Sequence, residues 1–245
     1  MNAVVFGASR GMGRAVAREL ALRGDRLFLV GHVVDQLAIS AGDIEIHGAK
    51  APVRTAYCDL LDPGTFGPAL DRAQQELGNI DAVIVTAGLF GSQEELEHDP
   101  AFAARLLTAN FTNTVLFCEE ARRRLLAAGG GTLCVFSSVA GDRGRKPVIL
   151  YGAAKAGLSR YLEGLDHKFR SAGLKTVCVK PGFVKTGMTS GLKPPPFAGT
   201  PDAVARRVVK AIDRGWPEVY VPWPWSWVMR IIRHLPRFCM RRIGF

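Results

Sequence analysis

Residues 3–20 read AVVFGASRGMGRAVAREL, an apolar strand-like run followed by a glycine-rich turn and an amphipathic helical pattern. Gly7, Gly11 and Gly13 permit a tight turn and a close approach of the backbone to a pyrophosphate, which would rest on the N-terminus of the following helix. A strand, such a turn and a helix in this order predict a dinucleotide-binding unit rather than a glycine-rich turn without a ligand. The spacing is G-x-x-x-G-x-G and not G-x-G-x-x-G.

Strand-like and helix-like segments alternate along the rest of the chain. The strand-like segments are continuous runs of Val, Ile, Leu and Phe, as expected for a parallel sheet covered on both faces. Strands are predicted at Ala3–Phe6, Arg26–Val30, Val53–Tyr57, Ala82–Val85, Thr132–Phe136 and Thr176–Val179. Helices are predicted at Met12–Arg23, after Asp62-Pro63, over Ala101–Ala127, and from the segment that carries Tyr151 to about Ser171. Repeated units of this kind predict one α/β domain with a Rossmann-like, doubly wound parallel sheet over residues 1–221, and residues 222–245 form a tail.

Composition limits the classes of protein to which the chain can belong. Its 245 residues, 48% of them hydrophobic, are enough for one sizeable core. The five cysteines are far apart and show no metal-ligand spacing, so we predict reduced thiols and no metal site. The N-terminus enters a strand at once and no apolar run reaches about 18 residues, so we expect no signal peptide, no transmembrane helix and a cytoplasmic location.

Residues 137–155, SSVAGDRGRKPVILYGAAK, hold a hydroxyl, a phenol and an ammonium at spacings suited to one proton-handling site. Ser138 follows an apolar strand, and Tyr151 and Lys155 lie one turn apart on the same helix face. An ammonium at that distance favours the phenolate, so the sequence predicts a lowered pKa for Tyr151 and a general acid usable near neutral pH. A half-buried Tyr and a solvated Lys produce the same pattern, and the other motifs decide between the two interpretations.

Several motifs in order resemble the short-chain dehydrogenase/reductase family, over residues 3 to about 221. Besides the glycine loop and the Ser138–Tyr151–Lys155 arrangement, they are Asp59 after the third strand, Thr86-Ala87-Gly88 after the fourth, Asn110 on the long helix, and Pro181–Thr186 after the sixth. The chain departs from the family at Val85-Thr86, where Asn-Asn is usual, so the fine geometry of cofactor binding is open at that point.

The resemblance implies a role for each of these residues. Ser138 would hydrogen-bond the substrate oxygen, and Tyr151 would exchange its proton; Ser137 is the neighbouring hydroxyl, but Ser138 has the family's separation from Tyr151. Lys155 would hold the nicotinamide ribose, and Asn110 would position a water relay to it. The residues expected to contact the cofactor are Gly7, Ser9, Arg10, Gly11, Met12, Gly13, His32, Asp59, Leu60, Ala87, Gly88, Tyr151, Lys155, Pro181, Gly182, Val184 and Thr186. A homo-oligomer is expected from the family.

The choice between the two nicotinamide cofactors depends on the residue after the second strand. A carboxylate there would bind the adenosine ribose 2′-OH and select NAD, whereas a basic group would accept the 2′-phosphate of NADP. At this position the chain has Gly31-His32 and no carboxylate. Arg10 matches a position that is basic in many NADP-using relatives. The sequence therefore favours NADP(H), and NAD(H) stays possible because His32 is mostly neutral at pH 7.

The C-terminal tail carries half of the net charge of +10, since five arginines and no acidic residue follow Glu218. Trp223, Trp225 and Trp227 precede apolar residues interleaved with these arginines, which predicts a basic amphipathic segment at the inner face of a membrane. A lid over the active site and a dimer-packing segment are the alternatives. Nucleic-acid binding is not favoured, because the aromatic residues stand in one block rather than along a basic groove.

The substrate is indicated by a narrower resemblance. The tail, the stretch GLFGSQEELEHD at residues 88–99 and the stretch SSVAGDRGRK are together similar to the reductases of the decaprenylphosphoryl-ribose epimerising system. This implies reduction of the 2-keto group of a polyprenyl-phosphate-linked pentose, made by a partner oxidase, in the synthesis of an arabinose donor for the cell wall. Arg143, Arg145 and Lys146 would face that anionic substrate near Tyr151. The alternatives are a reductase of another lipid or soluble ketone (a steroid, a retinoid or a 3-oxoacyl chain) and a non-catalytic NADP-binding scaffold.

Overall fold

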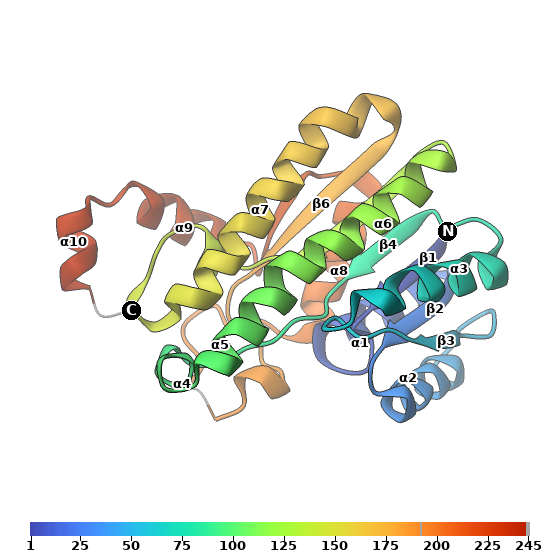
Figure 1. Ribbon diagram of the computed structural model, residues 1–245, viewed down its shortest axis with the longest axis horizontal. Helices are drawn as coiled ribbons and strands as arrows, with labels where there is room; N and C mark the ends of the chain where they lie inside the picture. Colours follow the sequence, from blue (N-terminus) through green and yellow to red (C-terminus); the bar gives the residue numbers. More distant parts are fainter. Residues whose placement is uncertain (192, 244–245) are drawn as a thin grey trace.

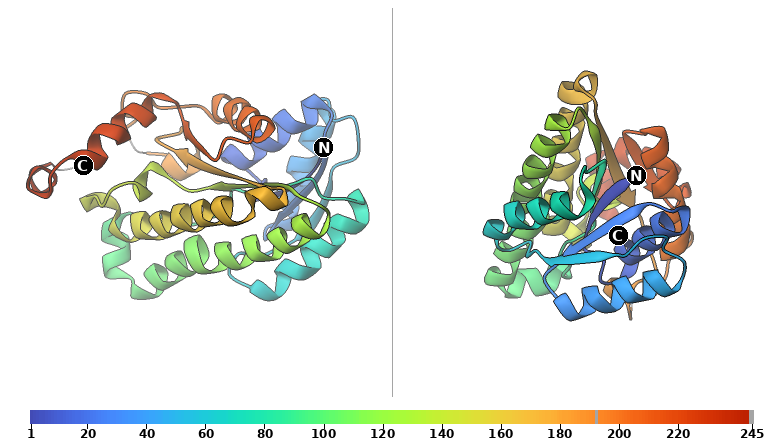
Figure 2. Two further views of the ribbon diagram at one scale, coloured as in Figure 1. Left: turned by 90° about the horizontal axis from the view of Figure 1, so that it is seen from above. Right: turned by 90° about the vertical axis from the view of Figure 1, so that its right-hand side faces the viewer.

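A seven-stranded parallel sheet lies between two layers of helices in the computed structural model, which describes residues 1–191 and 193–243 (Figure 1, Figure 2). The strands are β1 (Asn2–Phe6), β2 (Arg26–Gly31), β3 (Arg54–Tyr57), β4 (Ala82–Val85), β5 (Gly131–Phe136), β6 (Leu174–Pro181) and β7 (Glu218–Val221). Their order in the sheet is β3-β2-β1-β4-β5-β6-β7. The order reverses between β1 and β4, so the loops after these two strands separate and leave a crevice at the carboxyl ends. The predicted fold class is confirmed.

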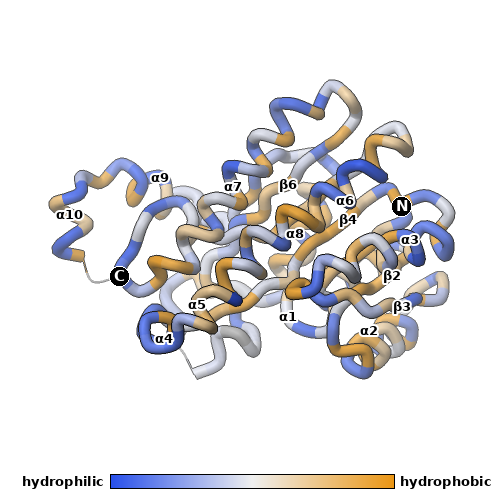
Figure 3. Tube along the Cα trace, viewed as in Figure 1, coloured by the Kyte–Doolittle hydropathy of each residue, from blue (hydrophilic) through white to orange (hydrophobic). Residues whose placement is uncertain are grey.

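Helices cover both faces of this sheet. They are α1 (Gly11–Arg23), α2 (Val34–Ile46), α3 (Phe66–Leu77), α4 (Gln93–His98), α5 (Pro100–Leu107), α6 (Thr114–Ala127), α7 (Ile149–Phe169), α8 (Pro201–Arg214), α9 (Pro224–His234) and α10 (Arg237–Arg242). Apolar residues of α1, α2 and α8 pack on one face, and those of α3, α6 and α7 on the other. The central strands are therefore hydrophobic along their whole length, as β4 shows in Figure 3. All five cysteines are free, and four of them are buried in this core.

The helix predicted over Ala101–Ala127 is not one continuous α-helix. A π-helical segment at Thr108–Asn113 separates α5 from α6. Such a wide turn re-aims the side chains within it and is frequent at functional sites. Asn110 and Asn113 lie in this segment, and both are buried.

The tail forms α9 and α10, which follow β7 in the chain and extend outward from the rest of the domain (Figure 1). Met229 and Ile232 of α9 are buried against Val139, which lies in the loop after β5. Residues 244–245 of the predicted tail lie outside the described part of the chain. Within residues 1–191 and 193–243, no helix has the length and apolar character needed to cross a bilayer.

Candidate active site

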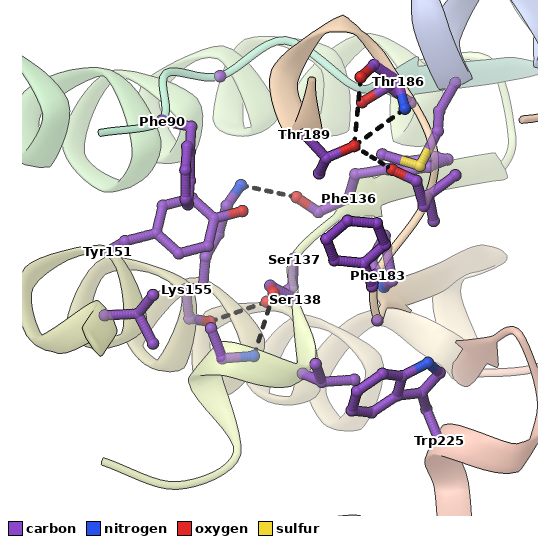
Figure 4. Close-up of a pocket in the computed structure, with 18 of the residues that line it drawn as sticks. Phe90, Phe136, Ser137, Ser138, Tyr151, Lys155, Phe183, Thr186, Thr189 and Trp225 are labelled. Atoms are coloured by element: carbon purple, nitrogen blue, oxygen red, sulfur yellow. Dashed lines mark hydrogen bonds between the residues drawn. The ribbon is translucent and has the colours of Figure 1, made fainter. Parts of the chain in front are cut away.

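A cavity of about 380 Å³ opens at the carboxyl ends of the central strands (Figure 4). It is bounded by the glycine loop after β1, the loops after β4, β5 and β6, the start of α7, and α9. Its apolar lining residues include Met12, Leu89, Phe90, Phe136, Val139, Val148, Phe183, Val184, Pro195 and Trp225. Its polar lining residues include Thr86, Ser138, Arg145, Tyr151, Lys155, Thr186 and Thr189. The cavity thus combines a few convergent polar groups with apolar walls, which is typical of a small-molecule site.

The glycine loop packs too closely for side chains at two of its positions. A Cβ on Gly13 would lie 2.2 Å from the carbonyl oxygen of Gly7, and one on Gly7 would lie 2.6 Å from the amide nitrogen of Ala87. Gly7 also has φ +93° and Gly11 has φ +60°, the left-handed region that glycine tolerates best. The backbone at the N-terminus of α1 therefore stays open to a ligand, which is what a pyrophosphate requires.

Thr86 fixes the position of the loop after β4, where the family usually has Asn-Asn. Its hydroxyl Oγ1 is 2.9 Å from the carbonyl oxygen of Phe6 and 3.1 Å from that of Gly7. The side chain thereby ties the end of β1 to the end of β4, directly beneath the glycine loop. The departure from the family at this position is visible in the sequence, but the role of the Thr86 hydroxyl is not.

Tyr151 and Lys155 both reach the cavity from α7, and Figure 4 shows the Tyr151 ring lying between Phe90 and Lys155. Burial raises the pKa of Tyr151 to about 12, and the neighbouring Ser138 hydroxyl opposes that shift. Burial also lowers the pKa of Lys155 to about 8. The expectation of a lowered Tyr151 pKa is therefore wrong for the protein without cofactor, because desolvation raises this pKa and the opposing contribution comes from Ser138.

The two neighbouring serines after β5 have different environments. Ser137 donates from Oγ to the carbonyl oxygen of Lys155 at 2.9 Å and shares a 2.7 Å hydrogen bond with Ser159. Ser138 lines the cavity, where its Oγ accepts a 3.0 Å hydrogen bond from the amide of Ala140. Ser137 is thus committed to fastening α7 to β5, whereas the Ser138 hydroxyl keeps a proton that it can direct toward a ligand.

Asn110 uses its side chain to hold the loop after β4. Its Oδ1 accepts from the amide of Leu89 at 2.8 Å, and its Nδ2 donates to the carbonyl oxygen of Leu89 at 2.7 Å. Gly88 lies between the side-chain amide of Asn110 and the ammonium of Lys155. A Cβ on Gly88 would be 2.8 Å from Asn110 Oδ1 and 3.8 Å from Lys155 Nζ. Any water relay through Asn110 would therefore use its backbone in the π-helical turn rather than its side chain.

The remaining cofactor candidates lie in the loops after β1, β2 and β3. Arg10 and His32 are exposed and follow β1 and β2, which pair in parallel and so bring the two loops side by side. Asp59, with Leu60 next to it, follows β3 and accepts a 2.9 Å hydrogen bond from the amide of Leu61. Ser9 lies in the glycine loop itself and is partly exposed.

The loop after β6 closes the other side of the glycine loop. Gly182 follows Pro181 and donates from its amide to the carbonyl oxygen of Val221 at 2.9 Å. Val184 forms a bridge to Gly199, and Thr186 lies 3.8 Å from where a Cβ on Gly11 would be. Residues after β1 and β6 thus face each other across the crevice, as a dinucleotide lying along these strand ends would require.

Of the three basic residues expected near the substrate, only Arg145 lines the cavity. Arg143 donates from Nη2 to the carbonyl oxygen of Leu235 at 2.7 Å, and Lys146 donates to that of Arg241 at 2.7 Å. The expectation for Arg143 and Lys146 is corrected: they hold the tail and do not face Tyr151. Burial lowers the pKa of the Arg145 guanidinium, and Asp142 partly offsets this shift.

Comparisons with known proteins agree with this geometry. Residues 1–195 match the family described as short chain dehydrogenase. An uncharacterized oxidoreductase of Mycobacterium tuberculosis is 35% identical over 240 residues, covering 98% of this chain and 96% of that protein. The 3-oxoacyl-[acyl-carrier-protein] reductase of Homo sapiens is 28% identical over 77% of this chain and 78% of its own length. A solved actinorhodin polyketide ketoreductase with NADPH superposes with a TM-score of 0.81 over 89% of this chain and 94% of that one, and at 20% identity this likeness shows the fold alone.

Proposed function

Because this chain belongs to the short-chain dehydrogenase/reductase family, we propose that it is an NADPH-dependent reductase of a ketone carried by a largely apolar, anionic molecule. The observation that carries the proposal is the convergence of Ser138, Tyr151 and Lys155 in one apolar cavity beside the glycine loop. A non-catalytic scaffold would need the loop but not these three groups together. The alternative of a scaffold is therefore not favoured.

The proton chemistry follows from the residues of the cavity. With its pKa raised to about 12, Tyr151 keeps its proton near neutral pH, as a proton donor to a carbonyl oxygen must. The Ser138 hydroxyl can donate a hydrogen bond to the same oxygen, and Lys155 adds positive charge beside the phenolate that forms. A bound reduced nicotinamide would supply a hydride to the carbonyl carbon, so that hydride and proton together convert the ketone into an alcohol.

NADPH is favoured over NADH by the charges at the adenosine end. Arg10 and His32 are exposed at the ends of adjacent strands, and the residue directly after β2 is His32 rather than a carboxylate. A guanidinium there can form charge-assisted hydrogen bonds with a 2′-phosphate.

The substrate class follows from the cavity wall and the tail. The cavity is mainly apolar but includes the guanidinium of Arg145, which suits an anionic group on an otherwise apolar substrate. On the tail, Trp223, Trp227 and Ile231 are 55%, 57% and 65% exposed beside arginines, as expected of a segment that rests on an anionic membrane. A polyprenyl-phosphate-linked 2-keto pentose, delivered by a partner oxidase at the membrane surface, has both features. The protein would act there as a peripheral homo-oligomer.

A 3-oxoacyl chain is the second candidate substrate. It is favoured by the apolar walls of the cavity and by the similarity to the human 3-oxoacyl-[acyl-carrier-protein] reductase. The keto sugar has its phosphate directly on the sugar ring, whereas a 3-oxoacyl chain has no phosphate near its carbonyl, so the two candidates make different demands on Arg145.

The test is to supply NADPH with a 2-keto polyprenyl-phosphopentose or with acetoacetyl-coenzyme A, and to follow oxidation of the cofactor. We expect turnover of the keto sugar, lost by at least about a hundredfold in Tyr151→Phe while NADPH binding by fluorescence titration is unchanged. Turnover of acetoacetyl-coenzyme A alone would favour the second candidate. Near-normal reduction by Tyr151→Phe would refute the role of the phenol.

A further inference from the structure

Helix α9 presents its tryptophans to two different environments. Trp225 lines the cavity, and Figure 4 shows its ring on the side of Ser138 opposite to Tyr151. Trp223 and Trp227, on either side of it in sequence, are more than half exposed. The tail therefore contributes a wall to the candidate active site as well as an outer surface.

The indole ring of Trp225 occupies space that a glycine leaves open. A Cβ on Gly182 would lie 2.4 Å from the ring atoms of Trp225, so the ring rests directly on the backbone after β6. Nε1, one of the ring atoms next to Gly182, donates to the carbonyl oxygen of Phe197 at 3.3 Å. The same edge of the ring thus contacts both the backbone after β6 and the loop that leads to α8.

Contacts on both sides of the cavity hold α9 in place. Met229 and Ile232 pack on Val139, which is the residue after Ser138. On the other side, Pro222 abuts Gly199, since a Cβ there would be 2.6 Å from the proline ring. Arg143 adds its hydrogen bond to the end of α9. A wall fastened in this way cannot withdraw easily to admit a larger substrate.

We propose that Trp225 is a specificity-determining residue, supplied by the tail, which limits the size of the apolar group that a ketone can place beyond Ser138. This inference deepens the proposed function and rests on it for the identity of the substrate as a ketone. The ring faces the cavity from the side opposite the proton donor, so it contacts the substituent of the carbonyl and not the reacting oxygen. Replacing the indole by a smaller side chain enlarges that part of the cavity.

The experiment compares cyclohexanone with the bicyclic ketone 1-decalone in the wild-type protein, Trp225→Ala, Trp225→Leu and Trp227→Ala. Kd is measured by calorimetry with NADP⁺ present, and kcat/KM by oxidation of NADPH. We expect Trp225→Ala to shift the preference toward 1-decalone by about tenfold, and Trp225→Leu to shift it in the same direction by less. Trp227→Ala, on the outer face of the same helix, should leave the ratio of the two ketones unchanged.

An unchanged ratio in both Trp225 variants, a shift toward cyclohexanone, or no binding of either ketone by the wild-type protein would overturn the inference. Thermal unfolding shows which variants are folded, and Trp225→Leu keeps enough bulk to pack where Trp225→Ala does not. A shifted Kd ratio without turnover of any ketone would refute the proposed reduction and leave the role of Trp225 standing.

Discussion

The ammonium nitrogen of Lys155 lies 5.8 Å from the centre of the Tyr151 ring and donates a 2.8 Å hydrogen bond to the carbonyl oxygen of Phe136. The spacing of the two residues in sequence predicts their proximity but not the depth at which they lie. Burial favours the neutral form of both groups, raising one pKa to about 12 and lowering the other to about 8. Without cofactor, the site therefore holds a protonated phenol and an amine that is close to losing its proton.

The first prediction concerns pH. Since burial lowers the pKa of Lys155 to about 8, this side chain loses its charge as pH rises through 8 rather than through its usual range above 10. We expect kcat/KM for NADPH, which reports the free enzyme, to be constant below pH 7 and to fall above pH 8 by about tenfold per pH unit. A profile that stays flat to pH 9.5 would show that the charge on Lys155 is not required.

Thr86 offers a test of the cofactor loop. Thr86→Val removes the hydroxyl that bonds the carbonyl oxygens of Phe6 and Gly7. We expect the Kd for NADPH to rise about tenfold and the free energy of unfolding to fall by about 1 kcal/mol. Thr86→Ser keeps the hydroxyl and should restore both values. The role fails if Thr86→Val binds NADPH like the wild type, measured by fluorescence titration.

A buried ion pair joins the loop after Ser138 to β6. Lys180 Nζ lies 2.8 Å from Asp142 Oδ1, both side chains are 2% exposed, and Tyr220 donates to the other carboxylate oxygen at 2.7 Å. Asp142→Asn leaves the Lys180 ammonium buried without this partner, and we expect a loss of about 3–5 kcal/mol in urea unfolding.

Glu218 provides the matched control for that variant. It also pairs with Lys180, but its side chain is 43% exposed, so Glu218→Gln should cost about 1 kcal/mol or less. Equal losses in the two variants would mean that burial does not decide the strength of this pair.

The sheet was predictable because each central strand is buried on both faces and is therefore a continuous apolar run. Helices α2 and α8 and strand β7 were not assigned, although α8 begins at Pro201 after a capping Thr200 and ends at Gly215. The π-helical turn at Thr108–Asn113 was also missed, because one extra residue in a turn hardly changes the apolar pattern of a long helix.

The candidate site, like the fold, was predicted from the sequence only in part. Motif spacing identified Ser138, Tyr151 and Lys155, which the structure brings into one cavity. Spacing could not show which groups the long basic side chains contact. Arg143, which was expected to face the substrate, donates a hydrogen bond to the tail. The sequence placed Trp225 in the amphipathic pattern of the tail, with a lid over the active site as one alternative, because its place in the cavity depends on how the tail folds back against β6.

Arg10 gives a prediction on cofactor preference. We expect the wild-type protein to bind NADPH more tightly than NADH, and Arg10→Gln to raise the Kd for NADPH about tenfold with little effect on NADH, since only NADPH has a 2′-phosphate. Arg18 is exposed on α1, the helix that begins directly after Arg10, and Arg18→Gln should change neither Kd. Tighter binding of NADH by the wild type, or equal losses for both cofactors in Arg10→Gln, would contradict the assignment.

The last prediction concerns the outer face of α9. Deleting the tail would also remove Met229 and Ile232 from their contact with Val139, so a double variant of the exposed face, Trp227→Ser with Ile231→Glu, is the cleaner test. We expect the wild-type protein to sediment with phosphatidylglycerol vesicles more than with phosphatidylcholine vesicles, because the arginines of the tail add attraction to anionic lipid. The bound fraction of the double variant should fall about tenfold, since it loses apolar area and gains a negative charge.

Ile39 is 66% exposed on α2, so Ile39→Glu adds the same charge elsewhere and should bind like the wild type. Wild-type protein that stays in the supernatant with both vesicles would show that this face has another use.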